Sequence, residues 1–264
     1  TWNKWEFIGG VRVEHTDQGY VLKFARDIDP EGKQKYTDVL PSFHAKYNVH
    51  KNANLRFSYA RSINRPSFFE IVPYSIINED YKEKGNPGLK HTVADNIDLR
   101  YEFFPKSSEQ FMVGLFYKKL NDPIEYGLLN EGQDTYYKPM NFGDATNLGV
   151  EIDIMKYFNW FGVKANYTYT HSEVTTDKRI MDGSEVTSVK QSRPLFGQAA
   201  HVANLSLLFK ETKYQWEGQL AFSYTGKRLS DISNWYNDDI WEAGYSQLDA
   251  SVEKSFKNGI SIFA

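Results

Sequence analysis

The chain contains no cysteine among its 264 residues, which excludes a disulfide framework, a thiolate zinc site and a cysteine nucleophile. It has no run of about 18 consecutive apolar residues, so no transmembrane helix is expected. Its formal net charge is only −3, whereas nucleic-acid-binding proteins usually carry a clustered basic excess. We therefore expect no nucleic-acid partner, no cysteine chemistry and no helical membrane anchor.

Aromatic residues are abundant, because they make up 16% of the chain and include 18 tyrosines and 18 phenylalanines. Such side chains favour β-strands, and they also form the aromatic girdles of membrane-spanning β-barrels. The negative mean hydropathy does not exclude a barrel, because every second residue of a barrel strand and most of its loop residues are polar.

Strict alternation of apolar and polar residues between positions 96 and 117 predicts a β-hairpin. Successive side chains of a strand point to opposite faces, so alternation places one row of side chains on each face. A turn at Pro105-Lys106-Ser107-Ser108 separates the two halves. The apolar row contains Ile97, Leu99, Tyr101 and Phe103, then Phe111, Val113, Leu115 and Tyr117, and the polar row begins with Asn96, Asp98, Arg100 and Glu102.

The same alternation recurs along the chain and predicts about ten full strands and a truncated eleventh. Tight turns are predicted near residues 51, 106, 159, 212 and 257. Long polar connections are predicted over residues 16–37, between residues 60 and 96, after residue 120, and over residues 172–197 and 227–243. Within the first of these, Tyr20 to Phe24 is a candidate to extend the strands beyond a membrane as a hairpin. Short turns at one end and long loops at the other are the layout of an outer-membrane barrel.

Charged residues concentrate on one of the two predicted faces. A dry core would not accept so many charges, so this face is expected to look into a wet or plugged lumen. The opposite rows carry almost no charge where a bilayer midplane would lie, and an Arg or Lys there would cost about 2–4 kcal/mol. The charged rows contain Arg12, Lys46, Arg56, Arg100, Glu102, Asp153, Lys164 and Glu253. The alternative is a soluble antiparallel sheet with one wet face, which the very long loops disfavour.

We expect the chain to be a segment of a larger barrel. Residues 2–13 already have a strand pattern, and residues 260–264 end inside another. Bacterial barrels have an even number of strands and no free edge in lipid, so eleven strands need further strands. The predicted fold class is all-β: a partial transmembrane antiparallel β-barrel, with residues 1–264 forming one partial barrel domain.

Two motifs carry a resemblance to a known family. The first is the run from Tyr59-Ala60-Arg61 to Arg65-Pro66, and the second is Gly85-Asn86-Pro87-Gly88-Leu89-Lys90, followed by a strand that bears Asn96 and Asp98. They resemble the C-terminal barrel of TonB-dependent outer-membrane receptors, although His91 stands where the family usually has Pro. Similar later segments are Asn141-Phe142-Gly143-Asp144-Ala145 before Gly149-Val150-Glu151, and Tyr245-Ser246-Gln247-Leu248-Asp249-Ala250-Ser251.

The resemblance implies a 22-strand barrel with an N-terminal plug, of which this chain would supply about strands 11 to 21, without the plug and the last strand. It implies location in the outer membrane of a Gram-negative bacterium, among outer-membrane lipids. In the family, the receptor captures a scarce nutrient, and the TonB complex, contacted through the absent N-terminal part, drives its import. Siderophore, glycan, peptide and vitamin remain open as ligands. The alternative function is a passive porin or a structural outer-membrane barrel without a plug.

Candidate ligand-binding residues lie in the last long loop. Aromatic side chains together with carboxylates suit either sugar stacking or a cationic chelate. The candidates are Trp235, Tyr236 and Trp241 with Asp231, Asp238 and Asp239. For the family-motif residues Arg65, Pro66, Gly85, Asn86 and Pro87 we favour a structural role in the loop over direct ligand contact.

No enzymatic, cofactor or metal motif is present, so no catalytic residue, cofactor or metal site is predicted. The strand residues His44 and His201 are expected to be solvated or lumenal, and Asn237-Asp238-Asp239 lacks the spaced oxygen ligands of an EF-hand loop. An outer-membrane hydrolase would need a nucleophile beside a base. The nearest pair, His171 and Ser172, is adjacent in sequence and therefore expected on opposite faces of a strand.

Overall fold

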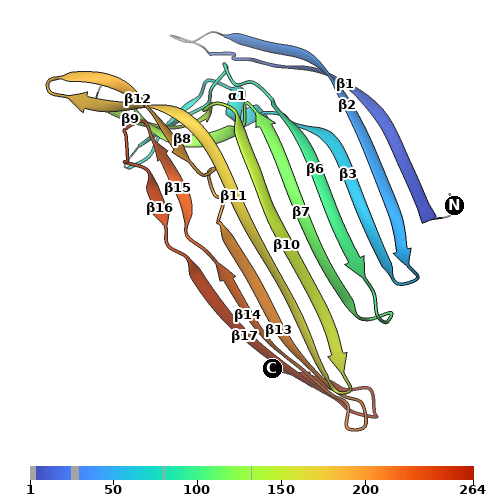
Figure 1. Cartoon of the computed structure of the whole chain (residues 1–264). Helices are drawn as coiled ribbons and strands as arrows, with labels where there is room; N and C mark the ends of the chain where they lie inside the picture. The colour runs from blue at the N-terminus through green and yellow to red at the C-terminus, as the bar shows by residue number, and fades with distance from the viewer. Residues whose placement is uncertain (1–3, 25–29, 80, 132) are drawn as a thin grey trace.

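The structure is a computed structural model that describes residues 4–24, 30–79, 81–131 and 133–264. Its main feature is one long, curved antiparallel sheet (Figure 1). The strands of this main sheet, in spatial order, are β1 (Trp5–Val21), β2 (Glu31–His50), β3 (Ala53–Asn64), β6 (Thr92–Phe103), β7 (Gln110–Asn121), β10 (Ala145–Phe158), β11 (Phe161–Asp182), β13 (His201–Glu211), β14 (Trp216–Thr225), β17 (Tyr245–Ser255) and β18 (Ser261–Phe263). Within the described residues, this path holds ten long strands and a short eleventh, as predicted, and a twelfth strand of the sheet, β12 (Glu185–Arg193), pairs with β11 beside the path.

The strand register aligns the apolar residues of neighbouring strands. Phe7 stands opposite Ala45, Ala45 opposite Phe57, Phe57 opposite Leu99, and Leu99 opposite Leu115. Phe7 is 52% exposed and Leu115 is 51% exposed, and no second layer covers this row in the described part of the chain. A soluble antiparallel sheet with one wet face, the alternative considered from the sequence, would instead cover this apolar row. We call the face with this row the outward face.

The other face carries the predicted charged row in the same register. Glu6 pairs with Lys46, Lys46 with Arg56, and Arg56 with Arg100. We call it the inward face. Since the side-chain period of a strand is two, a slip of one residue at any pairing would send these charges to the apolar face. The register therefore separates lipid-compatible from water-compatible side chains across the sheet.

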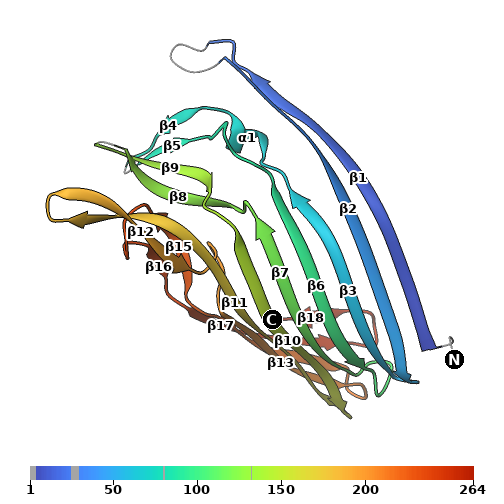
Figure 2. The ribbon, with the colours of Figure 1, turned by 45° about the horizontal axis from the view of Figure 1, so that its top comes forward.

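The five predicted tight turns join consecutive strands of the main sheet at one end, close to residues 51, 106, 159, 212 and 257. Asn159 closes one of them with a φ of 54°, a conformation that Asn tolerates better than most residues. The long connections lie at the opposite end, as Figure 2 shows. The predicted asymmetry between turns and loops is confirmed.

Two of the predicted polar loops are instead long hairpins. In the first, β1 and β2 remain paired from Thr16 opposite Tyr36 to Val21 opposite Glu31. In the second, β11 continues to Asp182 and pairs with β12 (Glu185–Arg193). The hairpin extension expected at Tyr20 to Phe24 is confirmed as far as Val21. The strand boundaries predicted from hydropathy at residues 16 and 172 were wrong, because a backbone ladder needs no apolar side chains and polar strands can extend beyond a membrane.

The remaining long connections also contain strands, and these form a second sheet, which we call the loop sheet. Two of its pairings, β15–β8 and β5–β9, are parallel and join separate loops. In spatial order its strands are β16 (Ile240–Glu242), β15 (Arg228–Ser233), β8 (Ile124–Glu131), β9 (Asp134–Asn141), β5 (Lys82–Lys84) and β4 (Ser75–Ile77). Three loops are thereby tied into one unit.

Buried apolar residues gather around this loop sheet. Tyr20 at the far end of β1 packs with Ile71 and Val72, next to the one-turn helix α1 (Phe68–Ile71). Leu229 and Ile232 on β15 are 0% and 1% exposed. The buried apolar core of the described residues therefore lies at the loop end.

In the described residues no helix could traverse a bilayer.

Candidate functional site

A buried ion pair ties β8 to the end of β12. Arg193 donates from Nη2 to Oε2 of Glu125 over 2.9 Å and from Nη1 to Oε1 over 3.1 Å. The two side chains are 2% and 4% exposed. Glu125 Oε1 also accepts the backbone N–H of Phe196 at 2.7 Å. A bidentate guanidinium–carboxylate pair fixes both distance and orientation, so this contact locks two loops together.

A second buried ion pair ties β11 to the loop between β15 and β16. Lys178 Nζ lies 2.6 Å from Asp239 Oδ1, with both side chains almost completely buried. Asp239 Oδ1 also accepts the backbone N–H of Ser233 at 2.9 Å, and Lys178 donates to the carbonyl oxygen of Ser233. Burial lowers the pKa of the Lys178 ammonium, although Asp239 opposes this effect. Asp239 is thus a structural carboxylate.

The other candidates of the last loop are divided by the structure. Asp238 accepts a hydrogen bond from Ser233 Oγ at 2.8 Å, and Trp235 is half-buried, with its backbone N–H donating to the same hydroxyl at 3.1 Å. Tyr236 is 41% exposed and Trp241 is 44% exposed. Lys227 Nζ lies 5.1 Å from the centroid of the Trp241 ring. The aromatic candidates Tyr236 and Trp241 remain accessible to a ligand.

The Gly-Asn-Pro motif connects three segments at the loop end. A Cβ on Gly85 would overlap with the carbonyl oxygen of Val72, so only glycine allows this approach. The backbone N–H of Asn86 donates to the Glu70 carbonyl at 2.6 Å, and its side-chain amide donates to the Pro139 carbonyl at 2.9 Å. The motif therefore joins α1 to β9.

The remaining family-motif residues also hold the loop to the inward face. Arg65 donates from Nε to Thr16 Oγ1 at 2.8 Å and pairs with Glu14 through Nη2. Pro66 is buried, whereas Pro87 is exposed and its carbonyl accepts from Gln34 Nε2 at 3.1 Å. These contacts are those expected of residues with a structural role in the loop.

A cluster of tyrosines at the loop sheet was not predicted from the sequence. Tyr126 and Tyr137 stack with ring centroids 5.3 Å apart, and Tyr126 Oη donates to Glu70 Oε1 at 3.1 Å. Tyr74 Oη donates to Glu83 Oε1 at 2.7 Å. Burial and then the Glu83 carboxylate raise the pKa of Tyr74 to about 12. The alternation within residues 124–141 is the sequence signal that could have placed two of them on one strand pair.

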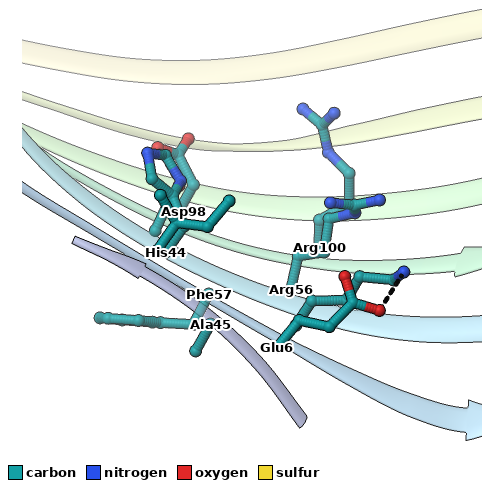
Figure 3. A pocket seen from close by; sticks show the side chains of 10 residues that line it. Glu6, His44, Ala45, Arg56, Phe57, Asp98 and Arg100 are labelled. Carbon is teal, nitrogen blue, oxygen red and sulfur yellow. Dashed lines mark hydrogen bonds and ion pairs between the residues drawn. The ribbon is translucent and has the colours of Figure 1, made fainter. Parts of the chain in front are cut away.

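The inward face bears a hollow of about 280 Å³ on β1, β2, β3 and β6. Its charges are paired across strands: Lys46 lies 3.0 Å from Glu6, and Arg56 lies 2.7 Å from Glu102. Figure 3 shows Glu6, Arg56 and Arg100 toward one end of the hollow and His44 with Asp98 toward the other. His44 therefore faces the lumenal side, and the described residues contain no cluster of three or more acidic or histidine residues that could hold a metal ion.

Comparison with known proteins decides the family. The sequence model of the outer membrane protein beta-barrel family matches residues 1–262. The chain belongs to this family. No curated protein sequence matches it. Its outward apolar face is therefore the lipid-facing surface of an outer-membrane protein, and its inward charged face looks into the barrel.

Several solved structures share the fold of this family member. The siderophore receptor PirA from Acinetobacter baumannii matches with a TM-score of 0.64 and 16% identity, over 98% of this chain and 38% of its own. The FrpB iron transporter from Neisseria meningitidis matches with a TM-score of 0.63 and 12% identity, over 96% and 36%. The ferric enterobactin receptor PfeA from Pseudomonas aeruginosa matches with a TM-score of 0.59 and 16% identity, over 88% and 35%.

The chain thus spans little more than a third of the length of these receptors. The resemblance to the barrel of TonB-dependent receptors is confirmed at the level of the fold. The structural neighbours named above are transport proteins, which agrees with the absence of a predicted enzymatic role. His171 is exposed and Ser172 is buried, where its Oγ accepts the Leu195 backbone N–H at 3.1 Å, so this pair does lie on opposite faces.

Proposed function

We propose that the chain is part of a TonB-dependent outer-membrane receptor that binds a scarce nutrient at its extracellular mouth and imports it with energy transmitted by TonB. The fold shared with PirA, FrpB and PfeA over most of the chain is the observation that carries this proposal. The plug domain, the TonB-contacting segment and the last strand would then lie in the part of the receptor outside this chain.

The inward face supports a filled rather than an open lumen. Several of its cations are matched by carboxylates on neighbouring strands, as in the pairs Lys46–Glu6 and Arg56–Glu102. Ion pairs can still form hydrogen bonds with a protein in the lumen, and because their charges cancel they produce no strong positive or negative potential there. Such a wall suits a plug that must be held and then displaced, and it distinguishes this proposal from a passive porin.

The ligand contacts are proposed at the accessible aromatic residues of the last loop, Tyr236 and Trp241. Their flat rings can stack on the apolar face of a sugar or on an aromatic chelating group. Trp241 lies on β16 of the loop sheet, and the backbone N–H of Tyr236 donates to the Arg179 carbonyl at 2.9 Å. Asp238 and Asp239 are proposed to act through the loop structure, because each already accepts a hydrogen bond from Ser233.

Growth of a strain that lacks the full-length receptor tests the transport function. The strain is complemented with the receptor and grown on defined iron and carbon sources, with TonB present or deleted. We expect one source to support growth only when both the receptor and TonB are present. Growth that needs the receptor but is independent of TonB would indicate the passive porin instead.

The ligand site is tested on the source identified in that screen. Trp241→Ala together with Tyr236→Ala is expected to raise the concentration needed for half-maximal uptake at least ten-fold. Tyr214→Ala is the matched control, because Tyr214 is 60% exposed but lies on the turn side. Equal uptake by the double variant and the control would exclude the last loop as the contact surface.

A further inference from the structure

On the outward face, three neighbouring strands change from apolar to charged at the same register. Tyr59, Ile97 and Tyr117 stand side by side in the apolar row of β3, β6 and β7. The next outward residues are Arg61, Asp95 and Lys119, which are again direct partners in the ladder. These three charges therefore interrupt the outward apolar row near its loop end, where only Ile63 and Val93 follow them on β3 and β6.

Hydrogen bonds within this cluster occupy its only carboxylate. Asp95 Oδ1 accepts from Tyr59 Oη at 2.8 Å and from Arg61 Nε at 2.9 Å. Asp95 Oδ2 accepts from Arg61 Nη2 at 3.0 Å. The guanidinium is held in one orientation by this bidentate contact, while its side chain remains 40% exposed.

Lys119 is the unmatched charge of the cluster. It is exposed on the outward face. In the described ranges no ion pair within 4.0 Å joins it to a carboxylate, although its charge acts on Asp95 across the strand pair. Adjacent strands are about 4.8 Å apart, so Arg61 and Lys119 flank Asp95 across about 10 Å. Together the three side chains carry a net charge of +1, formed from two cations and one anion. The next carboxylate in the same ladder row is Glu173, two strands beyond Lys119.

We propose that Arg61 and Lys119 bind the phosphate groups of the glycolipid in the outer leaflet of the outer membrane. The lipid-facing band places acyl chains against Ile97 and Tyr117, and the headgroup then lies at the level of the two cations. Arginine offers planar paired donors and lysine a mobile point charge, and both bind phosphate. An anionic lipid surface attracts each nearby Lys or Arg by an energy that changes affinity about five-fold.

The chain offers a matched control for the unmatched cation. Lys118 precedes Lys119 on β7 and pairs in the ladder with Asn96, on the inward face. Replacing either lysine removes one positive charge from the same strand. Only Lys119 lies on the face that the lipids contact, so the two variants separate a headgroup contact from a general effect of net charge.

The test uses the full-length receptor in detergent, titrated with bisphosphorylated lipid A and with fully dephosphorylated lipid A, and followed by native mass spectrometry. Lys119→Gln is expected to weaken binding of the phosphorylated lipid about five-fold. Arg61→Gln with Lys119→Gln should weaken it further, and Lys119→Arg should restore it. Lys118→Gln and all experiments with the dephosphorylated lipid should show no difference from the unmodified receptor.

Two outcomes would overturn the proposal. One is equal affinity of the phosphorylated lipid for Lys119→Gln and the unmodified receptor. The other is the same loss of affinity in Lys118→Gln as in Lys119→Gln, which would show a non-specific effect of charge. The resistance of each variant to unfolding in detergent is measured alongside, so that a misfolded variant is recognised. If Lys119→Gln misfolds, Lys119→Arg decides the result, because it keeps the positive charge and should bind the phosphorylated lipid as the unmodified receptor does.

Discussion

Arg193 and Glu125 lie 68 positions apart in the chain and form a buried, bidentate ion pair at the loop end. Their strands, β12 and β8, belong to different sheets. The pair is therefore a connection between the long β11–β12 hairpin and the loop sheet. Removal of one buried partner leaves the other charge without compensation, which makes this connection sensitive to substitution.

Arg193→Ala is expected to destabilise the loop sheet by about 3–5 kcal/mol, because Glu125 would remain buried and unpaired. Hydrogen exchange of residues 122–144 in the full-length receptor measures the change. Lys190→Ala is the control, since Lys190 and Asp177 form an exposed pair with a distance of 3.7 Å, and such pairs contribute about 0–1 kcal/mol. Equal protection in both variants would contradict a locking role for Arg193.

Gly85→Ala is expected to displace α1 from the loop sheet, because the added methyl group would overlap with the Val72 carbonyl oxygen. Limited proteolysis between residues 65 and 91 should become faster. Gly88→Ala is the matched control in the same motif, as its Cβ would meet nothing closer than Asn86 Oδ1 at 3.3 Å. Equally faster cleavage in both variants would contradict the steric explanation, because it would show that either glycine protects the loop through backbone conformation alone.

Leu115→Arg is expected to cost about 2–4 kcal/mol, because the guanidinium would lie near the middle of the lipid-facing band. Met112→Arg is the contrast, since Met112 stands on the inward face with Glu102 and Asp153 as its ladder partners. Urea unfolding of the receptor in lipid vesicles compares the two. A larger loss for Met112→Arg would reverse the assignment of the two faces.

The raised pKa of Tyr74 predicts a pH dependence of the loop region. An unfolded tyrosine titrates near pH 10, whereas burial and the Glu83 carboxylate raise the pKa of Tyr74 to about 12. The native state therefore holds its proton more tightly, so this contribution to stability is complete below pH 10 and is lost as the pH rises through 12.

Ultraviolet absorbance of tyrosinate measures this titration in the folded receptor. We expect a late phase that becomes smaller in Tyr74→Phe, and that vanishes in denaturant. Tyr126→Phe should also reduce the late phase, because burial and the Glu70 charge raise the pKa of Tyr126. An unchanged late phase in Tyr74→Phe would contradict the assignment.

The main sheet could be predicted because its information is local. Apolar and polar residues alternate within a few positions, as at Ile97, Leu99 and Tyr101, because one face of the strand contacts lipid and the other contacts the lumen. A structural role for Asn86-Pro87 in the loop was favoured for a similar reason, since asparagine next to proline marks turns.

The loop end could not be predicted, because its contacts join residues that are distant in the sequence. Asp239 is one of the ligand-contact candidates, and nothing in the sequence pointed to its ion-pair partner Lys178, which lies 61 positions earlier. The parallel pairings of β15 with β8 and of β5 with β9 leave no periodic signal in either segment. Polar residues that form buried pairs look the same in a sequence as polar residues that meet solvent.

The parallel pairings of the loop sheet also constrain how this barrel protein can diversify. Strands contributed by three separate connections share one set of backbone hydrogen bonds. Recombination that replaced one of these loops with the loop of a related barrel protein would disrupt its strand pairings with the neighbouring loops. New surface specificities in this protein should therefore arise by point substitution at exposed tips such as Tyr236, or by inheritance of the whole assembly as a cassette.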